Sequence, residues 1–118
     1  MTDILPDIAE LLGNTAPVEL GWPDRERIFP CIILSEIGNE ASVILSGADR
    51  YSVITLQTDI YAEDERETRA LAISVNDILT GKGIKRSFSE FITDEDKPRM
   101  CMRYRFGIDE VTGRIVAL

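Results

Sequence analysis

The residues best suited to chemistry are three consecutive acids, Asp94, Glu95 and Asp96, in a polar stretch near the C-terminus. Carboxylates can hold a hard divalent cation, but such an ion needs about six oxygens arriving from several directions. Neighbours within one loop rarely supply that geometry, and the spacing of a calcium-binding loop is missing. We therefore interpret the acids as a solvated turn, with metal-dependent hydrolysis through Asp94 or Glu95 as the enzymatic alternative.

Other catalytic patterns are weak. The chain has no histidine, which removes the commonest general base and the usual Ser-His and Cys-His pairs. Lys82 lies between two glycines but follows a predicted helix, so this sequence indicates helix termination and not a phosphate loop. Cys31 and Cys101 form no CxxC motif. They are interpreted as reduced core residues, with a single disulfide as the alternative. No enzymatic activity, metal or cofactor is predicted.

Length and composition indicate one ordinary globular domain. The chain has 118 residues, of which 44% are hydrophobic and 29% are charged, values typical of a soluble fold. A formal net charge of −8 argues against binding DNA or an anionic membrane through bulk charge. No apolar run approaches the roughly 20 residues of a membrane span, and the N-terminus lacks the pattern of a signal peptide. We expect the protein to act where it is made.

Two helices are expected. Apolar residues between Ile4 and Leu12 recur at helical spacing, and Gly13 follows the last of them. The second helix begins after Asp64, which has capping-box spacing to Glu67. Its predicted buried stripe is Leu71, Val75, Ile78 and Leu79, with Ala72 beside it, and glycines end it.

Strands are expected over residues 31–37, 50–62, 84–92 and 100–109. In residues 50–62 apolar and polar residues alternate, the pattern of a strand with one wet face. In residues 100–109 the alternation is strict, and Cys101, Arg103, Arg105 and Asp109 share one side. Residues 18–20 form a brief extended piece, and residues 114–116 can pair back as a short strand.

This order of elements predicts an α+β domain. We expect a mixed or mostly antiparallel sheet of four to five strands, with both helices packed on one face because each has one apolar stripe. The single domain covers residues 1–118. Residues 1–27 form the first helix and a connector, and residues 28–118 form the sheet and the main helix.

Two features indicate contacts. Arg103 and Arg105, with Lys85 or Arg86 on the neighbouring strand, form a basic stripe on an acidic protein. Its explanation is either cross-strand pairing with Asp59 or Glu90, or contact with an acidic partner or a second copy. Residues 39–50 form a long link with three consecutive apolar residues, Val43, Ile44 and Leu45, which either fold over the core or meet a partner. Ile73, almost opposite Leu71, is a weaker indication of the same kind, explained alternatively by packing against the first helix.

Residues 50–81 read RYSVITLQTDIYAEDERETRALAISVNDILTG, after a Pro-initiated apolar strand and the long link. Here Asp59-Ile60-Tyr61-Ala62 leads into an Ala- and Leu-rich helix. Over residues 28–116 the chain resembles the tail-terminator, or tail-completion, proteins of long-tailed bacteriophages. Thr58, polar within the buried face, and the last strand pair depart from the family pattern.

The resemblance implies a structural protein of the virion tail or neck, assembled in the host cytoplasm. It implies a homo-oligomeric ring, typically hexameric, which caps the head-proximal end of the tail tube and contacts the tail tube protein and a head-side neck protein. DNA passes through such a ring without specific binding. Val43, Ile44 and Leu45 are then the expected apolar anchors, and Arg50, Arg103 and Arg105 the expected charged contacts between subunits. The alternatives are another phage neck component, such as a head-completion or adaptor protein, and a small non-phage binding module.

Overall fold

The computed structural model describes residues 2–21, 29–41, 50–94 and 97–118. It is an α+β domain, as predicted, with two helices and a six-stranded mixed sheet. The helices are α1 (Leu5–Leu12) and α2 (Glu65–Gly81). The strands are β1 (Val18–Leu20), β2 (Cys31–Ala41), β3 (Tyr51–Tyr61), β4 (Lys85–Asp94), β5 (Lys97–Asp109) and β6 (Ile115–Val116).

The strand order is β1-β2-β3-β5-β4, with β6 paired to β5. Among the described strands, β1 and β2 run parallel and the other pairs are antiparallel. Six strands replace the expected four to five because both short extended pieces pair with the sheet, β1 with β2 and β6 with β5. The long strands β3 and β5 lie at its centre.

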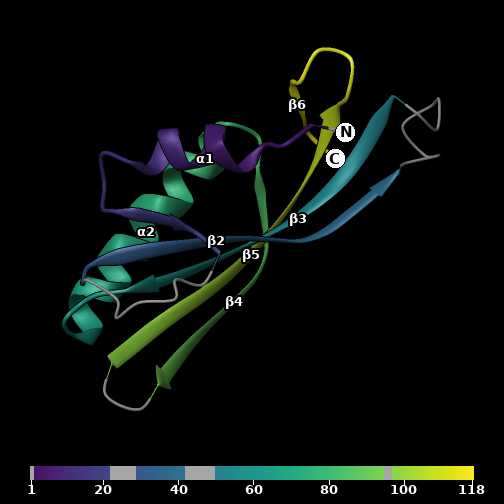
Figure 1. Ribbon diagram of the computed structural model, residues 1–118. Helices are drawn as coiled ribbons and strands as arrows, with labels where there is room; N and C mark the ends of the chain where they lie inside the picture. Colours follow the sequence, from purple (N-terminus) through teal and green to yellow (C-terminus); the bar gives the residue numbers. More distant parts are fainter. Residues whose placement is uncertain (1, 22–28, 42–49, 95–96) are drawn as a thin grey trace.

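Both helices cover the same face of the sheet, as predicted (Figure 1). We call this the inner face and the opposite side the outer face. The core between helices and sheet contains Ile8 and Leu12 from α1, Val75 and Leu79 from α2, and inward-facing residues of the central strands. On β5 these are Met102, Tyr104, Phe106 and Ile108, all buried. The strict alternation of this strand therefore predicted its two faces correctly.

Local hydrogen bonds explain the helix boundaries. Asp64 Oδ1 accepts the Glu67 backbone N–H at 2.8 Å, which confirms the predicted cap of α2. Asp3 Oδ1 accepts the Leu5 N–H at 3.3 Å at the start of α1. The polar Thr58 is accommodated in the core because its hydroxyl donates to the Met102 carbonyl oxygen on β5 at 3.4 Å.

Two expected boundaries were wrong. Strand β2 continues past residue 37 to Ala41, because a β-bulge between Glu36 and Gly38 lets the pairing with β3 continue. The link to β3 is therefore shorter than residues 39–50. The charged stretch at residues 93–98 is mostly strand, since Thr93 pairs with Pro98 and Asp94 with Lys97 in the β4–β5 hairpin.

The alternation of residues 50–62 predicted that the outer face is exposed to solvent. The structure shows that this face is buried over part of its length. Asp59 and Tyr61 are fully buried at one end of β3, where Tyr61 joins Cys31, Ile33 and Phe29 in a second apolar cluster. The Phe29 and Tyr61 rings lie 5.7 Å apart. Since this cluster involves residues from separate parts of the chain, strand periodicity alone gave no indication of it.

Candidate interaction surface

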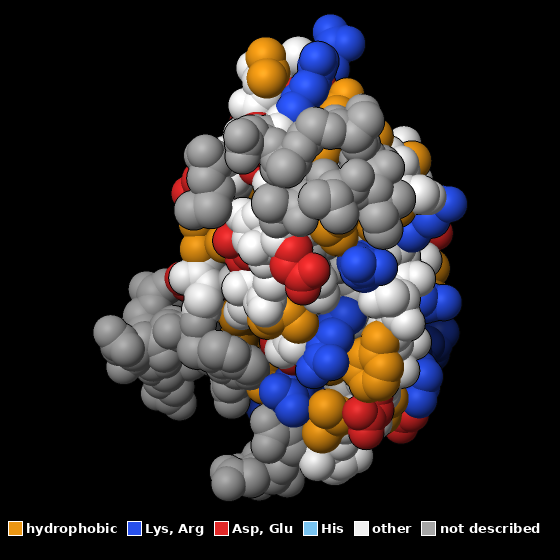
Figure 2. Space-filling view, turned by 90° about the vertical axis from the view of Figure 1, so that its right-hand side faces the viewer, with side chains coloured by type: hydrophobic (Ala, Val, Ile, Leu, Met, Phe, Trp, Pro, Cys, Tyr) orange, Lys and Arg blue, Asp and Glu red, His pale blue; other side chains and the backbone are white. Residues whose placement is uncertain are grey.

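The middle of the outer face carries a cluster of exposed cations, defined here as Lys85, Arg103 and Arg105. Arg105 has Thr55 of β3 and Lys85 of β4 as its register partners, and all three cations are exposed. Like charges directly opposite each other in a sheet are unfavourable. Figure 2, which views the molecule from the right-hand side of Figure 1, shows several Lys and Arg side chains beside hydrophobic and acidic ones. The structure thus brings together the predicted basic stripe.

Arg103 is held by two neighbours. Its Nε donates to Gln57 Oε1 at 3.1 Å, and its guanidinium lies 5.2 Å from the centre of the Phe88 ring, within the range of a cation–π contact. Gln57 in turn donates from Nε2 to Asp59 Oδ2 at 2.9 Å. The cation cluster is therefore connected, through one amide, to the buried carboxylate at the end of β3.

Cross-strand pairing with Asp59 or Glu90, one of the two explanations for the basic stripe, was wrong. Asp59 is paired with Arg99, at 3.5 Å between Nη1 and Oδ1, and Glu90 lies opposite Cys101. Sequence reasoning missed Arg99. It is an even number of residues from Arg103 and Arg105 and therefore lies on the same face of β5. Extending the alternating pattern to the start of β5 would have identified it. The neighbouring charged residues and Pro98 obscured that pattern.

Arg50, a predicted subunit contact, forms an ion pair within the chain. Its Nη2 lies 3.1 Å from Asp109 Oδ2, and the guanidinium lies 5.4 Å from the centre of the Tyr51 ring. The other carboxylate oxygen of Asp109 accepts the backbone N–H groups of Val111 and Thr112, at 2.9 and 3.4 Å. The hydrogen bond from Arg50, together with these backbone donors, lowers the pKa of Asp109 although burial opposes the shift.

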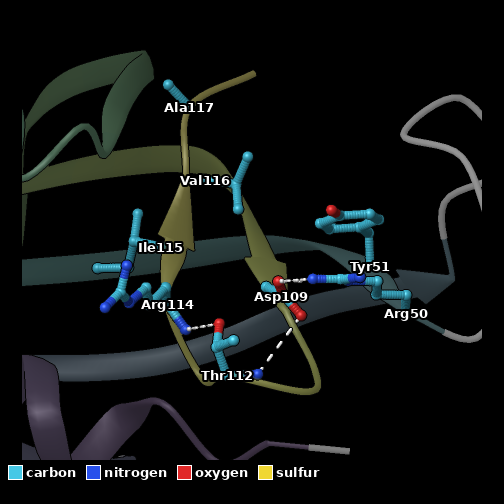
Figure 3. Close-up of a pocket in the computed structure, with 8 residues that line it drawn as sticks. All are labelled: Arg50, Tyr51, Asp109, Thr112, Arg114, Ile115, Val116 and Ala117. Atoms are coloured by element: carbon cyan, nitrogen blue, oxygen red, sulfur yellow. Dashed lines mark hydrogen bonds and ion pairs between the residues drawn. The ribbon is translucent and has the colours of Figure 1, made fainter.

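An open hollow of about 630 Å³ lies beside this ion pair, lined by β5, the turn after it and β6. Figure 3 shows the Arg50 side chain directed at Asp109, with Tyr51 next to it. The Asp109 carboxylate accepts four hydrogen bonds, two from Arg50 through Nε and Nη2 and two from the backbone. With its lowered pKa, it is poorly suited to act as a general base near neutral pH. We interpret this corner as a structural clamp between the start of β3 and the end of β5.

The two cysteines are free and buried, as predicted. Cys31 pairs with Tyr61, and Cys101 pairs with Asp59, so β3 runs between them. Strands are about 4.8 Å apart, and a disulfide is therefore not possible between these strands without large movement. Burial, followed by the nearby Asp59 carboxylate, raises the pKa of the Cys101 thiol, which keeps it in its less reactive protonated form.

Exposed large hydrophobic residues lie near both sides of the sheet. Leu20 and Ile37 lie on the β1–β2 side, with exposed fractions of 51% and 48%. Ile73 on α2 and Phe88 on β4 lie on the other side, at 64% and 40%. Ile73 therefore does not pack against α1, which was the alternative explanation. It borders a small groove with Met100 and Met102 between α2 and the β4–β5 hairpin.

Several predicted positions lie outside the described residues. These are the expected apolar anchors Val43, Ile44 and Leu45, and the acids Glu95 and Asp96. Among the residues that are described, three or more His, Cys, Asp or Glu side chains nowhere gather as a metal-ligand group. In the same part of the chain, neither helix is long and apolar enough to cross a membrane.

No family model and no curated protein sequence matches the chain. Function is therefore inferred from the surfaces described above. These are the cation cluster on the outer face, the part of β2 beyond Leu34 that β1 does not cover, and strand β4 at the opposite side of the sheet. Each of them carries exposed charged or apolar side chains.

Proposed function

We propose that the chain is a structural assembly protein, a ring-forming tail terminator of a long-tailed bacteriophage or prophage. In this role copies of the chain associate on the head-proximal end of the tail tube. The ring stops growth of the tube and provides a surface for joining the head. Its partners are other copies, the tail tube protein and a head-side neck protein.

The observation that carries the proposal is the cation cluster. Three exposed cations are held side by side on a protein whose formal net charge is −8, and Lys85 lies directly opposite Arg105. An acidic surface placed against them would relieve this repulsion. Because the chain itself is acidic, a second copy is a suitable source of that surface.

Two further features support the proposal. The described ends of β2 and β3 extend beyond the helices (Figure 1). In addition, β3 leads into the capped helix α2, the succession of elements on which the resemblance to tail terminators rests. The specific assignment to the tail comes from that resemblance, and the contact surfaces support the broader role in assembly.

Negative-stain microscopy of lysates from a phage lacking this gene tests the proposal. Abnormally long tail tubes beside filled, tailless heads are expected, because loss of a terminator removes the signal that stops tube growth. Tails of normal length that are not attached to heads would assign the protein to the head side of the neck instead. Normal virions would exclude both phage roles and favour a binding module outside the virion.

A further inference from the structure

Two segments that contain β-bulges, one in β2 and one in β4, lie on opposite sides of the sheet. One row of paired residues runs from Gly38 through Thr55 and Arg105 to Lys85, and the next runs from Glu36 through Leu56 and Tyr104 to Arg86. These two rows end in residues 36–40 of β2 on one side and in residues 85–88 of β4 on the other. Among the described strands, β1 covers β2 only as far as Leu34, and β4 pairs with β5 alone. Both segments are therefore lateral surfaces of the sheet (Figure 1).

The segments have opposite charge. Residues 36–40, the acidic edge, contain exposed Glu36 and Glu40; residues 85–88, the basic edge, contain exposed Lys85 and Arg86. Glu36 and Arg86 pair with inner-face residues, Leu56 and Tyr104, whereas Glu40 and Lys85 pair with outer-face residues, Val53 and Arg105. Each edge thus presents one charge on each side of the sheet.

Each edge also has one exposed apolar side chain beside its charges, Ile37 on the acidic edge and Phe88 on the basic edge. The charge asymmetry extends beyond the edges. The first 49 residues contain nine of the 21 acidic residues and two of the 13 basic ones. Strands β4 and β5 contain six basic residues. The two sides of the sheet therefore differ in charge as well as in position.

We propose that the acidic edge of one copy binds the basic edge of the next copy. Glu36 then meets Arg86 on the inner side, Glu40 meets Lys85 on the outer side, and Ile37 and Phe88 contribute apolar area between them. The incoming carboxylates also offset the repulsion between Lys85 and Arg105. This inference rests on the proposed self-assembly and names the surfaces that produce it.

The contact uses side chains and not continuous strand addition. A bulge lies in each edge segment, between Glu36 and Gly38 and between Arg86 and Phe88. Bulges interrupt the regular row of backbone donors and acceptors, and they protect edges against indiscriminate pairing. Because the two edges are different surfaces, the contact is head-to-tail, the type that generates a ring when its rotation closes.

The test uses two charge-reversed variants of the full chain, E36K/E40K and K85E/R86E, in sedimentation velocity over a concentration series. For each variant alone, the apparent Kd of self-association is expected to rise roughly 10- to 100-fold, because attraction is replaced by repulsion. Wild-type association should weaken as salt is raised. The control variant E10K/D77K changes the net charge as much as E36K/E40K does, on exposed helix positions, and should associate as wild type.

The decisive sample is an equal mixture of the two variants. One variant has two acidic edges and the other two basic edges, so alternating copies restore every contact and the mixture should associate like wild type. Restoration also demonstrates that both variants are folded. Variants that associate as well as wild type, or fail to recover on mixing, would overturn the edge assignment while leaving self-assembly in place. A wild-type chain that stays monomeric would overturn self-assembly itself.

Discussion

The outer face of the sheet differs between its two ends and its middle. At one end Asp59 is fully buried and paired with Arg99, and at the other Asp109 is paired with Arg50. In the middle, Arg105 lies opposite Lys85. The ends are stabilised by ion pairs within the chain, whereas the middle has a local excess of positive charge. The ends therefore contribute to the stability of the fold, and the middle is the part of this face that we propose contacts another copy.

The largest expected loss of stability is at the end of the outer face that contains Asp59 and Tyr61. Replacing Tyr61 with Ala should lower the free energy of unfolding by about 3–5 kcal/mol, because a fully buried aromatic ring leaves a cavity behind. Urea denaturation measures this as a shift in midpoint. The matched variant is Val53→Ala, on the same face of β3 but half-buried, where about 1 kcal/mol is expected. Equal losses at the two positions would mean that the two regions do not differ in packing.

The ion pair of the buried Asp59 should rank second. The change Asp59→Ala removes the acceptor of the Gln57 amide and a carboxylate that Arg99 contacts. A loss of about 2 kcal/mol is expected, since both groups lose an interaction with a fully buried charge while Arg99 keeps partial contact with solvent. For comparison, Arg103→Ala in the exposed middle should cost about 1 kcal/mol or less. If Arg103→Ala were the more damaging variant, the distinction between ends and middle would be wrong.

The pair at the opposite end should make stability depend on pH. The pKa of Asp109 is lowered, chiefly by the hydrogen bond from Arg50. The ionised carboxylate therefore contributes stability at pH values above its unfolded pKa of about 4, and this contribution is lost as the pH falls through the lower folded value. Comparing urea unfolding of wild type and Asp109→Asn between neutral and acid pH checks this. The difference between the two proteins should shrink below about pH 4, and a constant difference would contradict the assignment.

The smallest effect, with the opposite sign, is expected in the middle. The change Arg105→Glu converts a like-charge pair with Lys85 into an attractive one. A gain of about 0.2–1 kcal/mol in the free energy of unfolding is expected for such cross-strand pairs. Thermal and urea unfolding measure the gain, and Arg105→Gln should give an intermediate value. A loss of stability from Arg105→Glu would show that the native cation already has a favourable partner.

Much of the fold followed from local patterns. The alternation of β5 predicted which residues enter the core, and the spacing from Asp64 to Glu67 predicted the start of α2. Both patterns depend on near neighbours in the chain, which is why they can be read without the structure. The extension of β2 to Ala41 was missed because its bulge breaks the period of two that identifies a strand.

The candidate surface was predicted less completely. Arg103 and Arg105 share a face of the sheet because they are two residues apart on one strand. The partner of Asp59 depends instead on which strand lies beside β3. Arg99 faces Asp59 because β5 adjoins β3 in antiparallel register. Similarly, the ion pair of Arg50 could not be predicted from spacing, because the fold brings Asp109 to it from 59 positions away.

The sequence by itself therefore determined the elements, the faces of the strands and the positions of the charges, because each depends on spacing along the backbone. Only the tertiary structure decided which charges neutralise each other. The register of four strands places Glu36 and Glu40 at one edge and Lys85 and Arg86 at the other, with Glu36 and Arg86 at the two ends of one row. Electrostatic energy depends on distance in space, and those distances are set when the strands pair.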